Sequence, residues 1–326
     1  MTTLSSTVAN QIVPRLLAMR PLSAQRPRPI LTELANQYSI EGLNTNTKRL
    51  NRWADHGPAT AGTEGTTFST LTTMSMQTAV DLTPVEAAMM LAFVTDEAVE
   101  KLGLGFANAL ELFQSNNVDA ILAACEPFAD SILNGIEEKR ERDLAALFTS
   151  ATNTVGALAG DMSLTILEQA IFTADTLEQV HTDRVCVLGP RGISDLRKEL
   201  QVSSGGVQGV LWGNQRAPMV GEQPAGLVGE IWVPMYQLSQ SVVPTSGTVP
   251  GTGGHVGALL LRGQGNPEDI GGSGQTGALQ YVEGRRPTFA TDFKLRDRGV
   301  DLLGNCKYAV ALRAQDAIVG VLYDDA

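Results

Sequence analysis

The clearest chemical pattern in the sequence is Gly272-Ser273-Gly274-Gln275-Thr276-Gly277, which matches the GxGxxG signature of dinucleotide-binding loops. That signature binds a pyrophosphate only when a buried strand precedes it and a helix follows it. Here Asn266-Pro267-Glu268-Asp269 precedes the motif, and residues 244–279 are rich in Gly, Pro, Ser and Thr. The sequence therefore favours a glycine-rich loop. A nucleotide-dependent enzyme using Gly272–Gly277 is kept as an alternative.

The histidines and cysteines show no spacing typical of a metal centre or a disulfide framework. They are His56, His181, His255, Cys125, Cys186 and Cys306. The sequence has no CxxC pair, no GxxxxGK[ST] phosphate loop and no GxSxG motif. Cys186 lies in the apolar run Val185–Leu188, so we expect an inert core thiol. A triad assembled in space from distant residues stays open, but the pattern predicts no catalytic residue, no metal ligand and no cofactor.

Carboxylates and basic residues alternate between residues 137 and 143. The run contains Glu137, Glu138, Lys139, Arg140, Glu141, Arg142 and Asp143. Side chains three or four residues apart on a helix are neighbours, so opposite charges at this spacing form ion pairs. The run predicts a salt-bridged helix face and not a pair of catalytic carboxylates.

Composition limits the classes of protein that fit. The chain has 326 residues, 43% of them hydrophobic, which is enough for about two domains. The net charge of −11 argues against a general nucleic-acid binder. No apolar run is long enough to cross a membrane, and no secretory signal is recognisable at the N-terminus. The odd number of widely separated cysteines fits a reducing compartment.

Charge is unevenly distributed along the chain. Residues 1–60 hold seven Lys/Arg and three Asp/Glu, a net charge of +4, whereas the remainder carries −15. The N-terminal segment is basic, and its prolines interrupt any long helix. It therefore predicts an extended arm over residues 1–45 that lies on an acidic neighbour or faces DNA. An ordinary solvated tail is the alternative. In either case, most of residues 1–45 should need a partner surface to become ordered.

Residues 46–84 have the pattern of a long β-hairpin. Its legs are Thr47–Asp55 and Thr66–Leu82, and the turn-forming residues 56–65 separate them. The apolar side chains are too few to give the hairpin its own core, and an isolated hairpin is marginally stable in water. We therefore expect the hairpin to lean on another molecule.

The rest of the sequence predicts a mixed α and β body. The apolar run Met89–Val94 favours a strand over a helix beginning at Thr83, and residues 118–149 have the spacing of one long helix in which Pro127 marks a kink or a start. Thr165 with Glu168 forms a capping box for a helix through Phe172. Further expected elements are a helix at Asp96–Glu100, the strand Val185–Leu188, the helix Ile193–Leu200 with Pro190 at its start, and strands at Val207–Trp212, Gly229–Pro234, Ala258–Leu261, Thr288–Arg296, Tyr308–Arg313 and Ala317–Tyr323.

The order of these segments resembles the Hong Kong 97-like major capsid proteins of tailed bacteriophages and the encapsulin shells that share their fold. The residues that carry the resemblance are Thr63-Glu64-Gly65 in the hairpin, Leu82–Glu86 leading to Thr95-Asp96-Glu97, Ile136–Leu147 as a spine helix, Val185–Pro190 to Leu196, Gly229–Pro234, and Phe293–Arg298. Each motif is loose alone, and the specificity lies in their order across nearly the whole chain.

The resemblance implies an α+β Hong Kong 97-like fold. It divides the chain into the arm 1–45, an extended loop 46–84, a peripheral domain of residues 85–163 and 280–312 with the spine helix, and an axial α/β domain of residues 164–279 and 313–326. The implied function is that of a non-enzymatic major capsid protein that forms hexamers and pentamers of an icosahedral phage head around double-stranded DNA. An encapsulin-type cargo compartment is the alternative.

The resemblance also implies partners and contact residues. Expected partners are copies of itself, a portal protein, possible separate scaffolding and cement proteins, and packaged DNA on the inner face; no membrane partner is expected. The virion, assembled in the host bacterial cytoplasm, is the implied location. The residues expected at contacts between subunits are Arg15, Arg20, Arg49, Arg52, Trp53, Glu64, Phe68 and Met74.

Two departures from the family matter. Some shells of the family crosslink through a lysine on the extended loop, but no lysine lies between Lys48 and Lys101. We therefore expect non-covalent locking. No long charged helical segment precedes the arm, so scaffolding should come from a separate protein or from a segment that a protease has removed.

Overall fold

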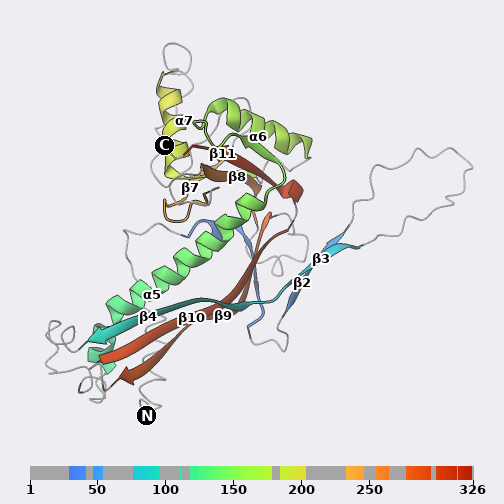
Figure 1. The fold of residues 1–326 in the computed structure, drawn as a ribbon. Helices are drawn as coiled ribbons and strands as arrows, with labels where there is room; N and C mark the ends of the chain where they lie inside the picture. Colours follow the sequence, from blue (N-terminus) through green and yellow to red (C-terminus); the bar gives the residue numbers. More distant parts are fainter. Residues whose placement is uncertain are drawn as a thin grey trace, which may run out of the picture.

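Two β-sheets and one long helix form the body of the molecule, and a β-hairpin leads away from it (Figure 1). The computed structural model describes residues 29–41, 47–53, 76–95, 111, 118–177, 184–202, 233–245, 254–263, 277–294, 299–313 and 315–324. The predicted helix at Asp96–Glu100, the strand at Val207–Trp212 and most of that at Gly229–Pro234 lie outside these residues.

The first sheet has four strands in the order β1-β9-β10-β4. Its centre is the antiparallel pair of β9 (Leu279–Lys294) and β10 (Gly299–Leu312), with β4 (Val85–Thr95) antiparallel to β10. β1 (Asn36–Ser39) pairs with β9 in parallel. The prediction of a strand and not a helix at Met89–Val94 is confirmed.

The last strands of the chain are longer than the sequence pattern predicted. β9 begins nine residues before Thr288 and β10 nine residues before Tyr308. These added stretches contain polar and charged residues that break the apolar pattern, such as Arg285 and Asn305. They still form strands because β9 and β10 pair with each other along most of their length, which satisfies the backbone whatever the side chains are.

The second sheet has five strands in the order β5-β11-β8-β6-β7. They are β5 (Thr154–Gly156), β11 (Ile318–Tyr323), β8 (His255–Leu261), β6 (Arg184–Leu188) and β7 (Met235–Gln237). A short 3-10 turn, η3 (Gln315–Ala317), leads into β11. Every residue of β6 and β8 is buried, because the layers on both faces of the sheet cover them.

Two helices cover one face of the second sheet. α7 (Pro190–Val202) begins with its proline at the first helical position, as predicted. α6 (Leu164–Thr176) begins one residue before the predicted cap, so the capping box of Thr165 with Glu168 is wrong. The cap is Ser163, whose hydroxyl accepts a hydrogen bond from the amide of Ile166 at 3.3 Å.

The long helix α5 (Val118–Ala146) runs along the first sheet and reaches the second (Figure 1). A 3-10 turn, η1 (Leu147–Ser150), completes the predicted stretch 118–149, and the helix is continuous through Pro127. Its buried stripe includes Ile132, Ile136, Leu144 and, from η1, Phe148. These side chains belong to one hydrophobic cluster that contains residues of both sheets, so the two sheets share a core.

The base of the predicted hairpin is present as β2 (Lys48–Trp53) and β3 (Met76–Leu82), paired antiparallel. Leu82 is buried with Tyr38, Ile40 and Val282 in a small cluster of its own. The base of the hairpin therefore rests on β1 and β9 of the same chain. The stretch 54–75 lies outside the described residues.

The last part of the predicted arm belongs to the body. Residues Leu31–Leu34 form the short helix α2, and Leu31, Leu34 and Ala35 are at most 2% exposed. The expectation that this stretch needs a partner surface to become ordered is wrong for residues 31–39. Their own apolar side chains join the shared core, and β1 extends the first sheet.

Candidate assembly surfaces

Three of the eight predicted contact residues lie in the described part of the chain, all on β2. Arg49 is exposed and forms an ion pair with Asp81 on β3 at 3.7 Å. Such an exposed pair contributes little stability. In the backbone register of the hairpin, Arg52 pairs with Gln77 and Trp53 with Met76. The other five, Arg15, Arg20, Glu64, Phe68 and Met74, lie outside the described residues, and the role of all eight in subunit contacts stays a prediction.

Polar and cation–π contacts reinforce the base of the hairpin. The ammonium of Lys48 lies 5.3 Å from the ring centroid of Tyr38, and the hydroxyls of Thr47 and Thr83 are 3.1 Å apart. Together with buried Leu82, these contacts join both strands of the hairpin to the edge of the first sheet. Contacts within this chain therefore hold the base of the hairpin against the first sheet.

Glu141 on α5 holds the beginning of α2. Its Oε2 accepts hydrogen bonds from the amides of Ile30 at 3.1 Å and Leu31 at 2.8 Å. Its Oε1 accepts from the amide of Thr32 at 2.8 Å and from the Thr32 hydroxyl at 2.7 Å. A helix start leaves amides without partners, and here a carboxylate from a distant helix satisfies them.

Glu141 is only 6% exposed. Burial raises its pKa above the usual range, and the hydrogen bonds from residues 30–32 oppose that rise. A pocket of about 100 Å³ lies beside the carboxylate. Its lining residues are Pro29, Ile30, Asn134, Glu137, Glu138, Glu141, Leu238, Ser239, Ser241 and Val242.

After α2 the chain packs closely against two glycines, Gly263 and Gly277, which flank the glycine-rich stretch. A Cβ on Gly263 would lie 2.5 Å from the backbone of Ala35 and Asn36, and a Cβ on Gly277 would lie 2.5 Å from Gly263. The amide of Gly263 also donates to the carbonyl of Leu34 at 2.6 Å. Gly277, the last glycine of the GxGxxG match, is thus required for close backbone packing.

The charged run of α5 divides into an exposed and a buried part. Lys139 pairs with Asp143, and Arg142 pairs with Glu138, which confirms the predicted ion pairs on an exposed face. Arg140 points the other way. Its guanidinium lies 5.6 Å from the ring centroids of both Tyr281 and Tyr308 and 3.4 Å from a carboxylate oxygen of Glu283.

Arg140 and its neighbours therefore fasten α5 to the first sheet. The rings of Tyr281 on β9 and Tyr308 on β10 are stacked at 5.8 Å. The hydroxyl of Tyr308 donates to Asp143 at 2.7 Å, and burial raises the pKa of this tyrosine. Neither the half-buried position of Arg140 nor the buried position of Glu141 was predicted, because their partners lie far away in the sequence.

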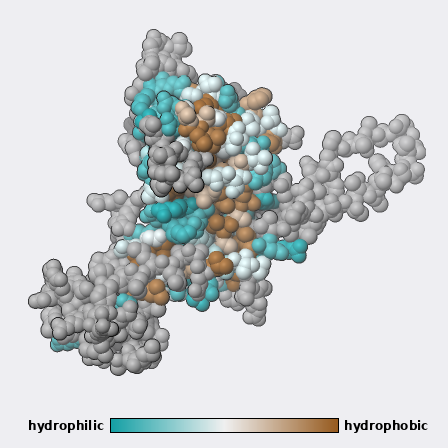
Figure 2. Space-filling view, in the orientation of Figure 1, coloured by the Kyte–Doolittle hydropathy of each residue, from teal (hydrophilic) through white to brown (hydrophobic). Residues whose placement is uncertain are grey.

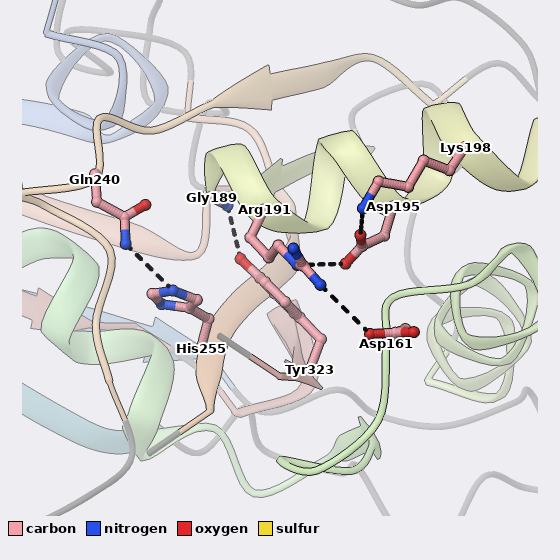
Figure 3. A network of polar contacts seen from close by, with 8 residues as sticks. All are labelled: Asp161, Gly189, Arg191, Asp195, Lys198, Gln240, His255 and Tyr323. Atoms are coloured by element: carbon pink, nitrogen blue, oxygen red, sulfur yellow. Dashed lines mark hydrogen bonds and ion pairs between the residues drawn. The ribbon is translucent and has the colours of Figure 1, made fainter. Parts of the chain in front are cut away.

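A second polar network joins α7 to the second sheet (Figure 3). The amide of Gly189 donates to the hydroxyl of Tyr323 at 2.7 Å, and the tilted rings of Tyr323 and His255 are 5.7 Å apart. On α7, the carboxylate of Asp195 forms ion pairs with Arg191 at 3.2 Å and with Lys198 at 3.0 Å. These contacts fix the beginning of the helix, and the side-chain amide nitrogen of Gln240 lies 3.4 Å from Nε2 of His255.

Other functional classes find no support in the described residues. No group of three His, Cys, Asp or Glu side chains there could hold a metal ion, and no described helix is long and apolar enough to cross a membrane. Cys186 and Cys306 are buried free thiols. Cys186 is fully buried, which confirms the prediction of a core thiol, and burial raises its pKa to about 12.

The hydrophobic surface in view gathers on the second sheet and its helices and in the middle of the molecule, between hydrophilic areas (Figure 2). Two large apolar side chains are exposed among the described residues: Val85 at 60% and Phe172 on α6 at 69%. Scattered exposed apolar residues are normal on a monomer and define no binding site by themselves.

Solved structures with the same fold are shell proteins. Over 93% of this chain and 94% of the other, the structure is similar to the head of Helicobacter pylori bacteriophage KHP40, with 11% identity and a TM-score of 0.59. The capsid of cyanophage P-SCSP1u matches 94% of this chain and 91% of its own, with 12% identity and a TM-score of 0.57. The SrpI encapsulin of Synechococcus elongatus matches 93% of this chain and 90% of its own, with 12% identity and a TM-score of 0.51.

No protein-family model and no curated protein matches the sequence. At identities this low the likeness shows the fold. It confirms the expected α+β Hong Kong 97-like fold, which phage capsids and encapsulins share, over nearly the whole chain.

Proposed function

We propose that this chain is the major capsid protein of a tailed bacteriophage, which assembles with copies of itself into the hexamers and pentamers of an icosahedral head. The observation that carries the proposal is the near full-length likeness to shell subunits, in which the phage heads have higher TM-scores than the encapsulin. In this role the protein is structural and not an enzyme. It acts in the virion after assembly in the host bacterial cytoplasm, with double-stranded DNA inside.

The two sheets support the proposed division of labour within the subunit. In this proposal the first sheet with α5 would belong to the peripheral domain of residues 85–163 and 280–312, and the second sheet to the axial domain of residues 164–279 and 313–326. Two strands depart from these bounds, because β1 of the first sheet comes from the arm and β5 of the second sheet comes from within residues 85–163. Axial domains would meet around the hexamer and pentamer axes. The hairpin of residues 46–84 would overlap a neighbour, and residues preceding 29 would run along another.

Further partners follow from the same proposal. A portal protein would occupy one vertex, and scaffolding and cement proteins would be separate chains. The absence of lysine between Lys48 and Lys101 favours a shell held by non-covalent contacts. Interfaces of thousands of Å² at about 25 cal/mol per Å² of apolar area would make such a shell very stable.

An encapsulin-type compartment is the second candidate, because the SrpI encapsulin also matches over nine-tenths of the chain. The nucleotide-dependent enzyme is not supported. The strand β9 begins at Leu279, two residues after Gly277, where a dinucleotide site needs a helix. The glycine at the end of that motif packs against backbone instead.

The test is electron microscopy and sedimentation of the expressed full-length chain, alone and in the presence of a crowding agent. Closed shells or rings of subunits are expected. A species that stays monomeric over the whole concentration range would contradict the proposal. Nuclease-protected double-stranded DNA inside shells purified from a phage lysate would support a head, whereas protein cargo without DNA would support the encapsulin-type compartment.

A further inference from the structure

The residues at the start of the described chain make a fixed series of contacts with the body. The first contact after Pro29 is with Glu141, through the amides of residues 30–32. Next, Leu31 and Leu34 are buried in the core, and the backbone of Ala35 and Asn36 packs closely against Gly263. Last, β1 pairs with β9. Along the chain from residue 29, the contact with Glu141 therefore comes before the contacts with the core and with the sheet edge.

We propose that Glu141 is a positioning residue for assembly, which fixes the point and direction in which the N-terminal segment leaves the body by holding residues 30–32 to α5. The proposal rests on the proposed function, because a defined exit matters only if that segment must reach a neighbouring copy. Tension on the segment from that neighbour would then be transmitted through Glu141 to α5, which Arg140 fastens to the first sheet.

Capping of α2 alone does not require this arrangement. Helix starts are usually capped by a neighbouring Ser, Thr, Asp or Asn, whereas Ile30 at this position offers no side-chain cap. The cap comes instead from a residue 110 positions away from Leu31. A distant carboxylate satisfies the same amides and in addition links two elements, which a local cap cannot do.

Charge alone does not explain the contact either. The neighbouring Glu137 and Glu138 carry the same sign as Glu141, as does Glu33 on α2. The packed segment 233–245 contains no charged residue. Arg140 is directed to Glu283, and Arg142 to Glu138 and the carbonyl of Ser241. The hold on residues 30–32 thus comes from directed hydrogen bonds to the carboxylate.

The first test is hydrogen exchange of the unassembled full-length subunit, comparing Glu141→Gln with wild type. A glutamine has one acceptor oxygen in place of two, and its NH₂ group would face the N–H donors of residues 30–32. Exchange at the amides of Ile30–Leu34 should be about tenfold faster or more, which corresponds to about 1.4 kcal/mol of local opening. Amides of β10 should be unchanged. Glu138→Gln is the matched control, because it makes the same chemical change on the same helix and pocket without touching α2.

The second test compares assembly of the same three proteins. The concentration needed for half-maximal shell formation should rise several-fold for Glu141→Gln and stay at the wild-type value for Glu138→Gln. Unchanged exchange at residues 30–34, equal effects of the two variants, or faster exchange with unchanged assembly would each overturn the proposal. Wild-type protein that forms no shell would contradict the proposed function, while the exchange experiment would still decide whether Glu141 is the anchor.

Discussion

Three carboxylates within six residues of α5 serve different purposes. Glu138 and Asp143 form ion pairs with basic residues on the exposed face, whereas Glu141 is buried and accepts four hydrogen bonds. Exposed pairs of this kind are worth about 0.3–0.5 kcal/mol each, but a buried charged acceptor that loses its donors is far more costly. The importance of a charge in this helix therefore depends on the side it faces.

The raised pKa of Glu141 makes a pH-dependent contribution to stability whose sign can be worked out. Burial lifts the folded-state pKa above the unfolded value of about 4.3, so the folded protein binds the proton more tightly. The protein with ionised Glu141 is therefore less stable than the protein with protonated Glu141, and this difference is removed as the pH falls through the folded pKa toward the unfolded one. The free energy of unfolding of wild type, relative to Glu141→Gln, should rise on acidification in that window. Urea unfolding of unassembled subunits at a series of pH values measures it, and a difference that falls on acidification would contradict the assignment.

At the scale of residues, the sequence predicted what depends on near neighbours. The ion pairs of residues 138–143 follow from helical spacing, and the buried thiol of Cys186 follows from its apolar strand. Nothing in the sequence indicates that Glu141 and Arg140 differ in role from the other charged residues of 137–143. Their partners, Thr32 and Tyr281, come from segments whose position beside α5 only the folded chain reveals.

At the scale of elements, the start of α6 can be tested by mutation. Ser163→Ala should lower the free energy of unfolding by about 1 kcal/mol, because the hydroxyl that accepts from Ile166 is lost. Thr165→Ala is the matched control and should change it by less than about 0.5 kcal/mol, since Thr165 is exposed within the helix. Chemical denaturation of unassembled subunits gives both values. The reverse ranking would restore Thr165 as the cap.

The glycines beside α2 offer a second test at this scale. Gly277→Ala places a methyl group 2.5 Å from the Cα of Gly263 and should destabilise the subunit by about 1–3 kcal/mol. Gly160→Ala is the control, because its nearest atom would be 3.6 Å away, an ordinary contact. Thermal unfolding compares the two. A Gly277→Ala subunit as stable as wild type would remove the packing role assigned to this glycine.

Most elements of the body were predictable, and the exceptions have physical reasons. Continuous apolar runs indicated β4 and β6, and periodic spacing indicated α5. The early half of β9 was missed because pairing with β10, and not an apolar pattern, makes it a strand. β1 was missed because it is short and lies beside a strand from the other end of the chain.

At the scale of the whole molecule, the shared core predicts that both sheets unfold together. Phe148 is fully buried in the cluster that contains residues of both sheets. Phe148→Ala should lower the free energy of unfolding by about 3–5 kcal/mol. Hydrogen exchange of core amides in β6 and β10 should show the same loss. Protection lost in one sheet alone would show that the sheets are separate folding units.

The fold as a whole was predictable from the order of segments, although no single motif was specific. Order and spacing are properties of the entire chain, and the likeness to solved shells confirms the fold that they implied over nine-tenths of its length. The boundary of the arm was not predictable. A weakly periodic stretch with four prolines gives no sign that Leu31 and Leu34 are buried under α5.

The parallel pairing of β1 with β9 has a consequence for biosynthesis. Asn36 pairs with Gln280, so β1, the first strand of the described residues, must wait on the ribosome for a partner made near the end of translation. At 5–20 residues per second this delay is roughly 10–50 s. An incomplete chain therefore lacks the strand that seats residues 36–39. Translation products that end before β9 would be unable to seat residues 36–39 in the sheet, so the pairing distinguishes them from chains that extend past β9.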